Sequence, residues 1–234
     1  MKKILVVSFC ALCALTASAQ RASSSSSSFF STEKVDGGVQ FGIRAGLNMA
    51  NVALKEDGGS GSYSTDSHAN WHVGVIADMP LMQSLYVQTG LFLSTKGYKV
   101  EGGDEDEKWK ETANPMYLQI PVLASYRYNF SEATQLQFNV GPYFAYGLGG
   151  KIKETDTYEG ETEEVKNDFF GDKEDAANYK RFDCGLQIGL GFTFAKHYYV
   201  GAAYEFGFVN FAAKDSEGGS IKNKNWMISV GYNF

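Results

Sequence analysis

The sequence has few prolines, and beyond its N-terminus it has no apolar run long enough for a membrane helix. Only 4 of its 234 residues are proline, and a spanning helix needs about 20 consecutive, mostly apolar residues. If the chain crosses a membrane, it must therefore do so with β-strands. Its 26 glycines, 14 tyrosines and 17 phenylalanines suit strands and tight turns, although a soluble all-β protein would contain them too.

Cysteine and positive charge are also scarce. Two of the 3 cysteines, Cys10 and Cys13, lie in an N-terminal leader, so only Cys184 would remain after its removal. A single cysteine excludes an internal disulfide framework. The formal net charge is −6 and becomes more negative when Lys2 and Lys3 leave with the leader. This acidic balance argues against nucleic acid as a partner.

The N-terminal residues have the three parts of a secretory signal peptide. Two lysines follow the first methionine, an apolar core comes next, and Ala17-Ser18-Ala19 supplies a small-x-small cleavage site. The following stretch includes an unbroken run of serines without periodicity, which predicts a flexible periplasmic leader. The expected organisation is a signal peptide (1–19), a serine-rich leader (20–38) and a β-barrel domain (39–234).

From Val39 onward, apolar and polar residues alternate with a period of two, which places neighbours on opposite faces of a strand. In the last ten residues every second position is large and apolar: Trp226, Ile228, Val230, Tyr232 and Phe234. The same alternation predicts eight strands, at 39–49, 71–79, 85–94, 116–129, 135–146, 181–194, 198–208 and 225–234. Pro121 and Pro142 fall inside two of them and are expected to mark a bulge or a locally broken pair.

The links between these strands alternate strictly between long and short. The long links are 50–70, 98–113, 149–180 and 212–224, and the short ones are 80–84, 130–134 and 195–197. An eight-stranded antiparallel up-and-down transmembrane barrel has this asymmetry, with short periplasmic turns and long extracellular loops. A sandwich or a soluble barrel has no reason to keep every long loop at one end.

The polar face of the strands indicates which way they point. Besides many glycines it carries a small set of charged and amide residues: Arg44, His72, Asp78, Gln119, Arg127, Asp183, Gln187 and Glu205. Small residues and pairs of opposite charge can fill a narrow lumen, whereas so much glycine would weaken a solvent-facing strand. We therefore expect an interior polar network, with the apolar face in lipid and aromatic girdles near both ends of that face.

Four segments resemble the small outer-membrane β-barrel family, often labelled the porin family or the outer membrane protein beta-barrel domain. They are FGIRAGLN (41–48), YLQIPV (117–122), GPYFAY (141–146) and DCGLQIGLG (183–191). The resemblance covers 39–234 and implies a barrel of the OmpA or OmpX type in the outer membrane of a Gram-negative bacterium. In that family a closing strand with a terminal aromatic is read by the barrel-assembly machinery, which would give Tyr232 and Phe234 that role. The family has no agreed activity.

No catalytic motif accompanies the strand pattern. His72 and Asp78 share one face of a predicted strand, as in a barrel protease, but an interior ion-pair network explains both more simply. The acidic stretches at 101–107 and 154–175 lack the spacing of a calcium loop, and the three histidines are too scattered for zinc. Solvated surface loops fit the acidic stretches better, so we expect no enzyme activity, metal or cofactor.

The sequence thus predicts an integral outer-membrane barrel with a structural or surface-interaction role. Polar side chains would plug its lumen, and the acidic links 98–113 and 149–180 would meet any extracellular partner. Its other expected partners are outer-membrane lipid and the barrel-assembly machinery. Two alternatives remain open. The chain is a small-solute channel if the interior charges leave a continuous water path, and a soluble lipocalin-like carrier if the apolar face points inward.

Overall fold

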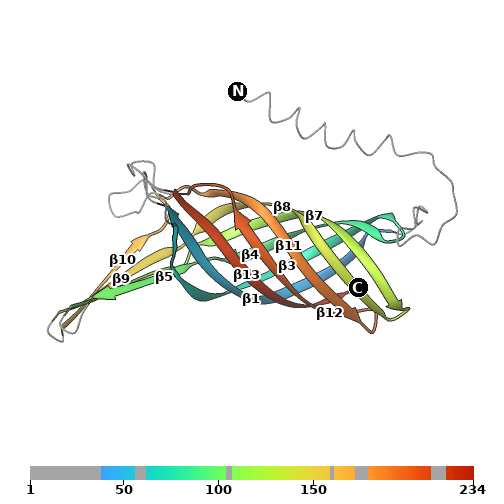
Figure 1. Ribbon diagram of the computed structural model, residues 1–234, viewed down its shortest axis with the longest axis horizontal. Coiled ribbons are helices and arrows are strands. Elements are labelled where there is room, and N and C mark those ends of the chain that lie inside the picture. Colours follow the sequence, from blue (N-terminus) through green and yellow to red (C-terminus); the bar gives the residue numbers. More distant parts are fainter. Residues whose placement is uncertain (1–37, 56–61, 104–106, 159–160, 172–178, 212–219) are drawn as a thin grey trace, which may run out of the picture. The chain divides into compact units, whose positions relative to one another are not determined.

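The computed structural model describes residues 38–55, 62–103, 107–158, 161–171, 179–211 and 220–234 (Figure 1). The expected signal peptide, and all but the last residue of the expected leader, lie outside the described residues. Within the described part, no helix is long and apolar enough to cross a bilayer.

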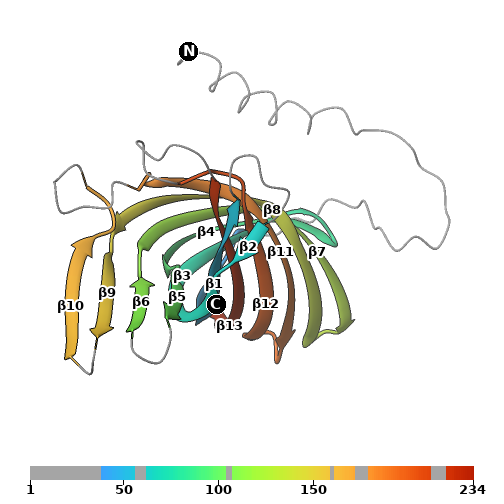
Figure 2. The same ribbon diagram turned by 60° about the vertical axis from the view of Figure 1, so that its left-hand side comes forward.

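Eight antiparallel strands form a closed barrel (Figures 1 and 2). They are β1 (Gln40–Lys55), β3 (Asp66–Met82), β4 (Leu85–Thr95), β7 (Met116–Ser131), β8 (Thr134–Gly149), β11 (Phe182–Phe194), β12 (Tyr198–Gly207) and β13 (Ser220–Asn233). Each pairs with the barrel strand that follows it in the chain, and β1 pairs with both β3 and β13, which closes the sheet. The predicted all-β, up-and-down barrel of eight strands is confirmed.

Five further strands occupy the links that we expected to be loops. They are β2 (Ser62–Ser64), β5 (Tyr98–Gly103), β6 (Glu107–Ala113), β9 (Lys151–Tyr158) and β10 (Glu161–Asp168). The order β3-β5-β6-β9-β10 runs without interruption through antiparallel pairs. We call the four-stranded sheet of β5, β6, β9 and β10 the extension, because it continues the barrel wall beyond the outer end (Figure 2). The interpretation of these stretches as solvated loops is therefore wrong for most of their described residues.

The apolar face of the barrel strands points outward. Aliphatic side chains such as Val75, Val140 and Ile228 are 54%, 47% and 55% exposed. We call the end with the short turns the periplasmic end, after its expected orientation. Exposed aromatics flank these aliphatic side chains at the outer end, which carries the extension (Trp71, Tyr146, Phe208, Trp226), and at the periplasmic end (Tyr128, Phe130, Tyr198, Phe234). This is the polarity of a membrane barrel with two aromatic girdles, and the opposite of a soluble barrel that carries an apolar ligand.

The two prolines interrupt strand pairing, as predicted. Between β7 and β8 the ladder runs to the pair Pro121 and Tyr143 and resumes only at Ala124 and Val140. The Thr89 hydroxyl donates a hydrogen bond to the Pro121 carbonyl oxygen at 2.8 Å. Pro142 stays within a continuous ladder on its other side, opposite Leu186. The ladder between β4 and β7 is also broken beside Pro121, between the pairs Thr89–Val122 and Phe92–Gln119. Both prolines are accommodated because each break is short and pairing resumes on either side of it.

The last residues fasten the closing strand to its neighbours. The backbone N–H of Asn233 donates to the carbonyl of His197 at 2.8 Å, and that of Phe234 donates to the carbonyl of Phe41 at 2.9 Å. The Tyr232 ring stacks on the His197 ring at 5.1 Å and lies 5.7 Å from the Phe234 ring. The chain end is therefore tied to both β1 and the turn between β11 and β12.

Candidate functional site

The lumen is lined by the polar face of the strands. Seven of the eight residues assigned to it from the sequence are at most 5% exposed: Arg44, His72, Asp78, Gln119, Arg127, Asp183 and Glu205. Gln187 is half-buried. The structure gathers these residues into separate layers along the barrel axis, each with partners that the alternation pattern did not identify.

The layer nearer the outer end is built on Lys96, which we missed. Its ammonium nitrogen lies 2.9 Å from a Glu205 carboxylate oxygen and 3.9 Å from one of Asp183, with all three side chains at most 1% exposed. We call these three residues the outer charge cluster. Donors surround the two acids: Gln119 and Asn225 donate to Glu205, and Asn223 and Tyr143 donate to Asp183. Buried charges held this way are paired and hydrogen-bonded, which offsets their desolvation.

None of the predicted strands included Lys96. It falls between the predicted strand ending at Ser94 and the predicted loop starting at Tyr98. Ser94 and Tyr98 are both buried, on the same side of the chain as Lys96. Continuing the alternation two residues past Ser94 would have placed Lys96 in the lumen.

A second ion pair lies toward the periplasmic end. A guanidinium nitrogen of Arg127 is 2.5 Å from an Asp78 carboxylate oxygen, and Gln88 donates to the other oxygen of Asp78 at 2.8 Å. The Arg44 guanidinium lies 3.9 Å from the centre of the Tyr199 ring and donates to the side chain of Asn233 at 2.7 Å. Each arginine is thus held by a named partner.

His72 belongs to neither charged layer. Its two ring nitrogens are hydrogen-bonded to the side chains of Asn48 and Ser229, at 2.8 and 2.9 Å. Asp78 is six residues farther along β3, about 20 Å away at the usual rise of a strand. The structure therefore does not bring His72 and Asp78 together as a protease site would require.

Among the described residues, a small cavity lies between the layers. The cavity in the middle of the barrel has a volume of ≈ 40 Å³ and is lined by Arg44, Gln88, Asn139 and Tyr199 among others. That volume holds about one or two water molecules. A wider vestibule of ≈ 460 Å³ opens at the periplasmic end, where Arg127, Asn129 and Thr193 are among its lining residues.

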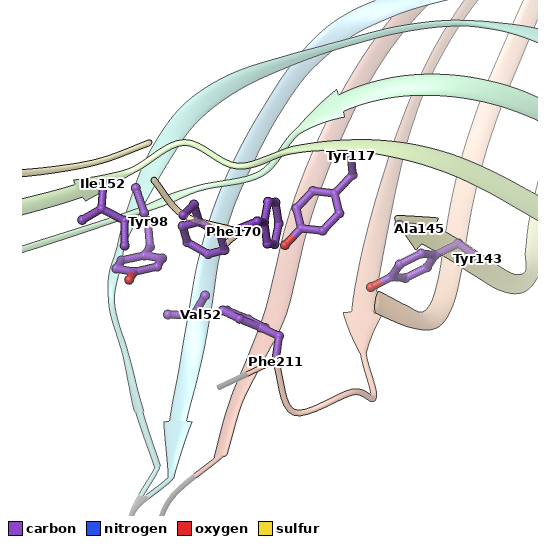
Figure 3. Close-up of a cluster of buried hydrophobic side chains, with 10 residues drawn as sticks. Val52, Tyr98, Tyr117, Tyr143, Ala145, Ile152, Phe170 and Phe211 are labelled. Atoms are coloured by element: carbon purple, nitrogen blue, oxygen red, sulfur yellow. The ribbon is translucent and has the colours of Figure 1, made fainter. Parts of the chain in front are cut away.

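An apolar plug lies above the outer charge cluster. We call it the aromatic cap: Tyr98, Tyr117, Phe169, Phe170 and Phe211, all at most 6% exposed (Figure 3). Ring contacts link four of them, with centroids 5.7 Å apart for Tyr117 and Phe170, 4.8 Å for Phe169 and Phe170 and 6.2 Å for Phe169 and Phe211, and Tyr98 belongs to the same buried cluster. The barrel therefore has an apolar layer at its outer end, the end that carries the extension.

A glycine in β8 makes room for this cap. A Cβ atom on Gly147 would lie 2.3 Å from the tip of the Phe170 ring, far closer than real side-chain contacts. Phe170 can therefore pack down onto the barrel wall only because residue 147 has no side chain. The pair Phe169-Phe170 was the available sequence signal, two adjacent aromatics in a strongly acidic stretch.

The described residues contain no group of three or more His, Cys, Asp or Glu arranged to hold a metal ion. Parts of the acidic stretches 101–107 and 154–175 lie outside the described residues, so the structure addresses them only at 101–103, 107, 154–158 and 161–171.

The model of the outer membrane protein beta-barrel domain family matches residues 18–213. The chain belongs to this family. No curated protein matches the sequence. Among solved structures, Ail, the attachment invasion locus protein of Yersinia pestis, is 16% identical over 83% of this chain and 98% of Ail, with a TM-score of 0.38. The outer membrane protein OprG of Pseudomonas aeruginosa is 15% identical over 83% of this chain and 95% of OprG, with a TM-score of 0.41.

Proposed function

We propose that this outer-membrane family member is a closed barrel that presents the extension to the exterior of a Gram-negative cell, in a structural or surface-interaction role. The observation that carries the proposal is the filled lumen. Two layers of ion pairs and an apolar cap lie in series along the axis, around a cavity of ≈ 40 Å³. An eight-stranded barrel is just wide enough for its own side chains to fill.

The extension supplies the surface for such a role. Its strands carry the exposed large side chains Trp109, Tyr158 and Val165 on the links 98–113 and 149–180. A partner outside the cell would meet these strands first, while the outward apolar face of the barrel meets outer-membrane lipid.

The refolded protein is expected to be electrically silent in a planar bilayer. Ions would need a continuous water path past Arg127, Lys96 and the aromatic cap, and each of these lies in a packed layer. Single-channel recording tests this, with a gel-mobility shift on heating to show that the barrel is folded and a general porin as the positive control. Steady discrete openings would contradict the proposal and favour the small-solute channel, with Arg44, Arg127, Asp183 and Glu205 as selectivity residues.

Deleting Phe234 is expected to reduce assembly in the outer membrane while export to the periplasm continues. The deletion removes the bond from its N–H to the Phe41 carbonyl and one aromatic ring of the periplasmic girdle, and with them the terminal aromatic that we propose the assembly machinery reads. The heat-modifiable, folded fraction in outer-membrane preparations measures the effect. The control Phe234→Tyr keeps the ring and the backbone bond and should assemble normally. Equal folded fractions for the deletion and the wild-type chain would refute this role.

A further inference from the structure

The strand register of the extension sorts its side chains onto two faces. Residues directly opposite each other in antiparallel strands project to the same face. One face continues the lumen side of the barrel wall, because Tyr98, Ala113 and Ile152 are paired in register and all buried. We call this the inner face and the opposite one the outer face.

Charge is separated between these faces. The inner face carries six carboxylates: Glu107, Glu111, Glu154, Asp156, Glu161 and Glu163. All six lysines of the extension fall on the outer face with three acids: Lys99, Lys108, Lys110, Lys151, Lys153, Lys166, Glu101, Glu164 and Asp168. Apart from Lys108, which lines a pocket beside Trp109 and Asp156, the register therefore places the lysines of the extension on the opposite side of the sheet from the inner-face carboxylates.

The ion pairs follow the same division. Lys99 pairs with Glu101, Lys151 with Asp168, and both Lys153 and Lys166 with Glu164, at 2.6 to 3.2 Å between charged atoms. All of these pairs lie on the outer face. On the inner face Glu111 accepts a hydrogen bond from the Tyr98 hydroxyl at 2.7 Å, and burial, together with the nearby Tyr179 and Glu111, raises the pKa of the Tyr98 phenol so that it remains a donor.

An exposed aromatic cleft lies at the end of β6 and β9, with inner-face side chains Glu107, Trp109, Asp156 and Tyr158 in its lining. A pocket of ≈ 700 Å³ is lined by Trp109, Asp156 and Tyr158 among others, and Lys108 and Thr157 of the same strands contribute to its wall. The Trp109 and Tyr158 side chains are 46% and 58% exposed. Asp156 lies directly across from Trp109 in the register. Aromatic faces beside a carboxylate attract cations, and exposed tryptophan and tyrosine commonly anchor protein interfaces.

Gly102 leaves room for the Trp109 ring in its observed orientation. A Cβ atom on Gly102 would lie 2.9 Å from the ring atoms of Trp109, so the indole lies over the backbone at that position and presents its other side to solvent. The absence of a side chain at Gly102 therefore leaves the space that the indole occupies beside the cleft.

The edge of the extension is available to an extended partner. Among the described residues, β10 pairs with β9 alone, and seven of its eight residues are exposed, with Asn167 half-buried. This free edge leaves the inner face open on the β10 side, so an extended segment can lie across that face.

We propose that the inner face of the extension is a docking surface for an extended cationic segment of another protein, with a lysine or arginine side chain seated between Trp109 and Tyr158. The inference rests on the proposed surface-interaction role and specifies the chemistry of the partner. Charge complementarity selects this occupant: the inner face offers carboxylates, whereas four of the six lysines that the extension of a second copy would offer are already paired with the acids of its own outer face.

The test measures binding of a fluorescent peptide of alternating lysine and threonine to the refolded full chain in nanodiscs of zwitterionic lipid. Fluorescence anisotropy should show saturable binding that weakens as salt is raised, while a peptide of alternating glutamate and threonine should not bind. Absence of saturable binding by the lysine peptide would overturn the proposal.

Two matched pairs of substitutions distinguish a docking face from simple net charge. Asp156→Asn with Glu163→Gln removes two negative charges from the inner face, and Glu101→Gln with Glu164→Gln removes two from the outer face. The inner pair should weaken peptide binding about tenfold, as the loss of two charge contacts implies, and the outer pair should change it about twofold or less. Equal losses for the two pairs would overturn the proposal in favour of non-specific attraction.

A third variant tests the cleft itself. Trp109→Ala should weaken binding about tenfold, an effect of the size seen for anchor residues, and should leave the dependence on salt unchanged because no charge is lost. Binding as tight as in the wild-type chain would contradict the seat between Trp109 and Tyr158. Sedimentation could instead show dimers of the wild-type chain that are lost in the double variant Lys99→Gln with Lys166→Gln. That result would assign the inner face to a second copy.

The outcomes separate this inference from the proposed function. A folded chain that is silent in the bilayer and does not bind the lysine peptide overturns the partner chemistry and leaves the closed barrel in place. A chain that conducts and still binds the peptide overturns the closed barrel and leaves the docking surface in place. The mobility shift on heating shows that each variant used is folded.

Discussion

Replacing Lys96 by methionine is expected to lower the free energy of unfolding by about 3–5 kcal/mol. The ammonium group lies between Glu205 and Asp183 in a layer that is closed to solvent. Methionine fills a similar volume but leaves two buried carboxylates without their cation. Urea titration of the refolded protein in lipid vesicles, followed by tryptophan fluorescence, measures the loss.

The control for this prediction is Lys99→Met. Lys99 also forms an ion pair, at 2.6 Å from Glu101, but its side chain is 29% exposed and that of Glu101 is 52% exposed. Water screens such a pair, so its loss should change the free energy of unfolding little. A second variant, Lys96→Met with Glu205→Gln, should recover part of the stability because it removes one of the stranded charges. Similar stabilities for Lys96→Met and Lys99→Met would show that the outer charge cluster does not hold the barrel together.

The alternation of apolar and polar residues predicted the barrel because successive residues of a strand face lipid and lumen in turn. Lipid favours apolar side chains and the lumen favours polar ones. Every barrel strand follows this pattern, so Val140 or Ile228 could be assigned outward and Arg127 inward from the sequence alone. The pairing of Arg127 with Asp78 could not be predicted in this way. It depends on which strands lie across the lumen from each other, and periodicity along one strand carries no information about the other.

The extension was missed because both of its faces meet water. In β6 the residues Glu107, Trp109 and Glu111 alternate with Lys108 and Lys110, so hydropathy shows no period of two. The sign of the charge does alternate, and that pattern is an equally good indicator of a strand with two different faces. Applied to the link 98–113, it would have predicted β6 and the separation of charge described above.

The aromatic cap could not be predicted from the sequence for another reason. Phe169 and Phe170 come from the stretch after β10, whereas Phe211 follows β12, so the three rings meet only when the barrel has formed. Phe169 and Phe211 have ring centroids 6.2 Å apart although they are 211 − 169 = 42 positions apart in the chain. Their burial is a tertiary effect without a local sequence pattern.

Replacing Leu190 by arginine should impair insertion of the barrel by about 2–4 kcal/mol. Leu190 is 46% exposed on the outward face and is paired with Phe138 and Ala202, within the aliphatic belt between the aromatic girdles. An arginine there must carry its charge into hydrocarbon or distort the bilayer. Val200→Arg should act in the same direction with a smaller effect, because Val200 is two residues from Tyr198 of the periplasmic girdle and the cost falls toward the interface. The folded fraction after dilution from urea into vesicles measures both.

The control is Val165→Arg. Val165 is 49% exposed and equally apolar, but it lies on β10 of the extension, where an arginine would stay in water. Loss of folding confined to Leu190→Arg and Val200→Arg would show that exposure to lipid, and not exposure as such, makes the substitution costly. Normal assembly of both barrel variants would overturn the assignment of the apolar face to lipid, and with it the argument that the polar face forms a lumen. The two arginine substitutions therefore test the inside and the outside of the barrel at once.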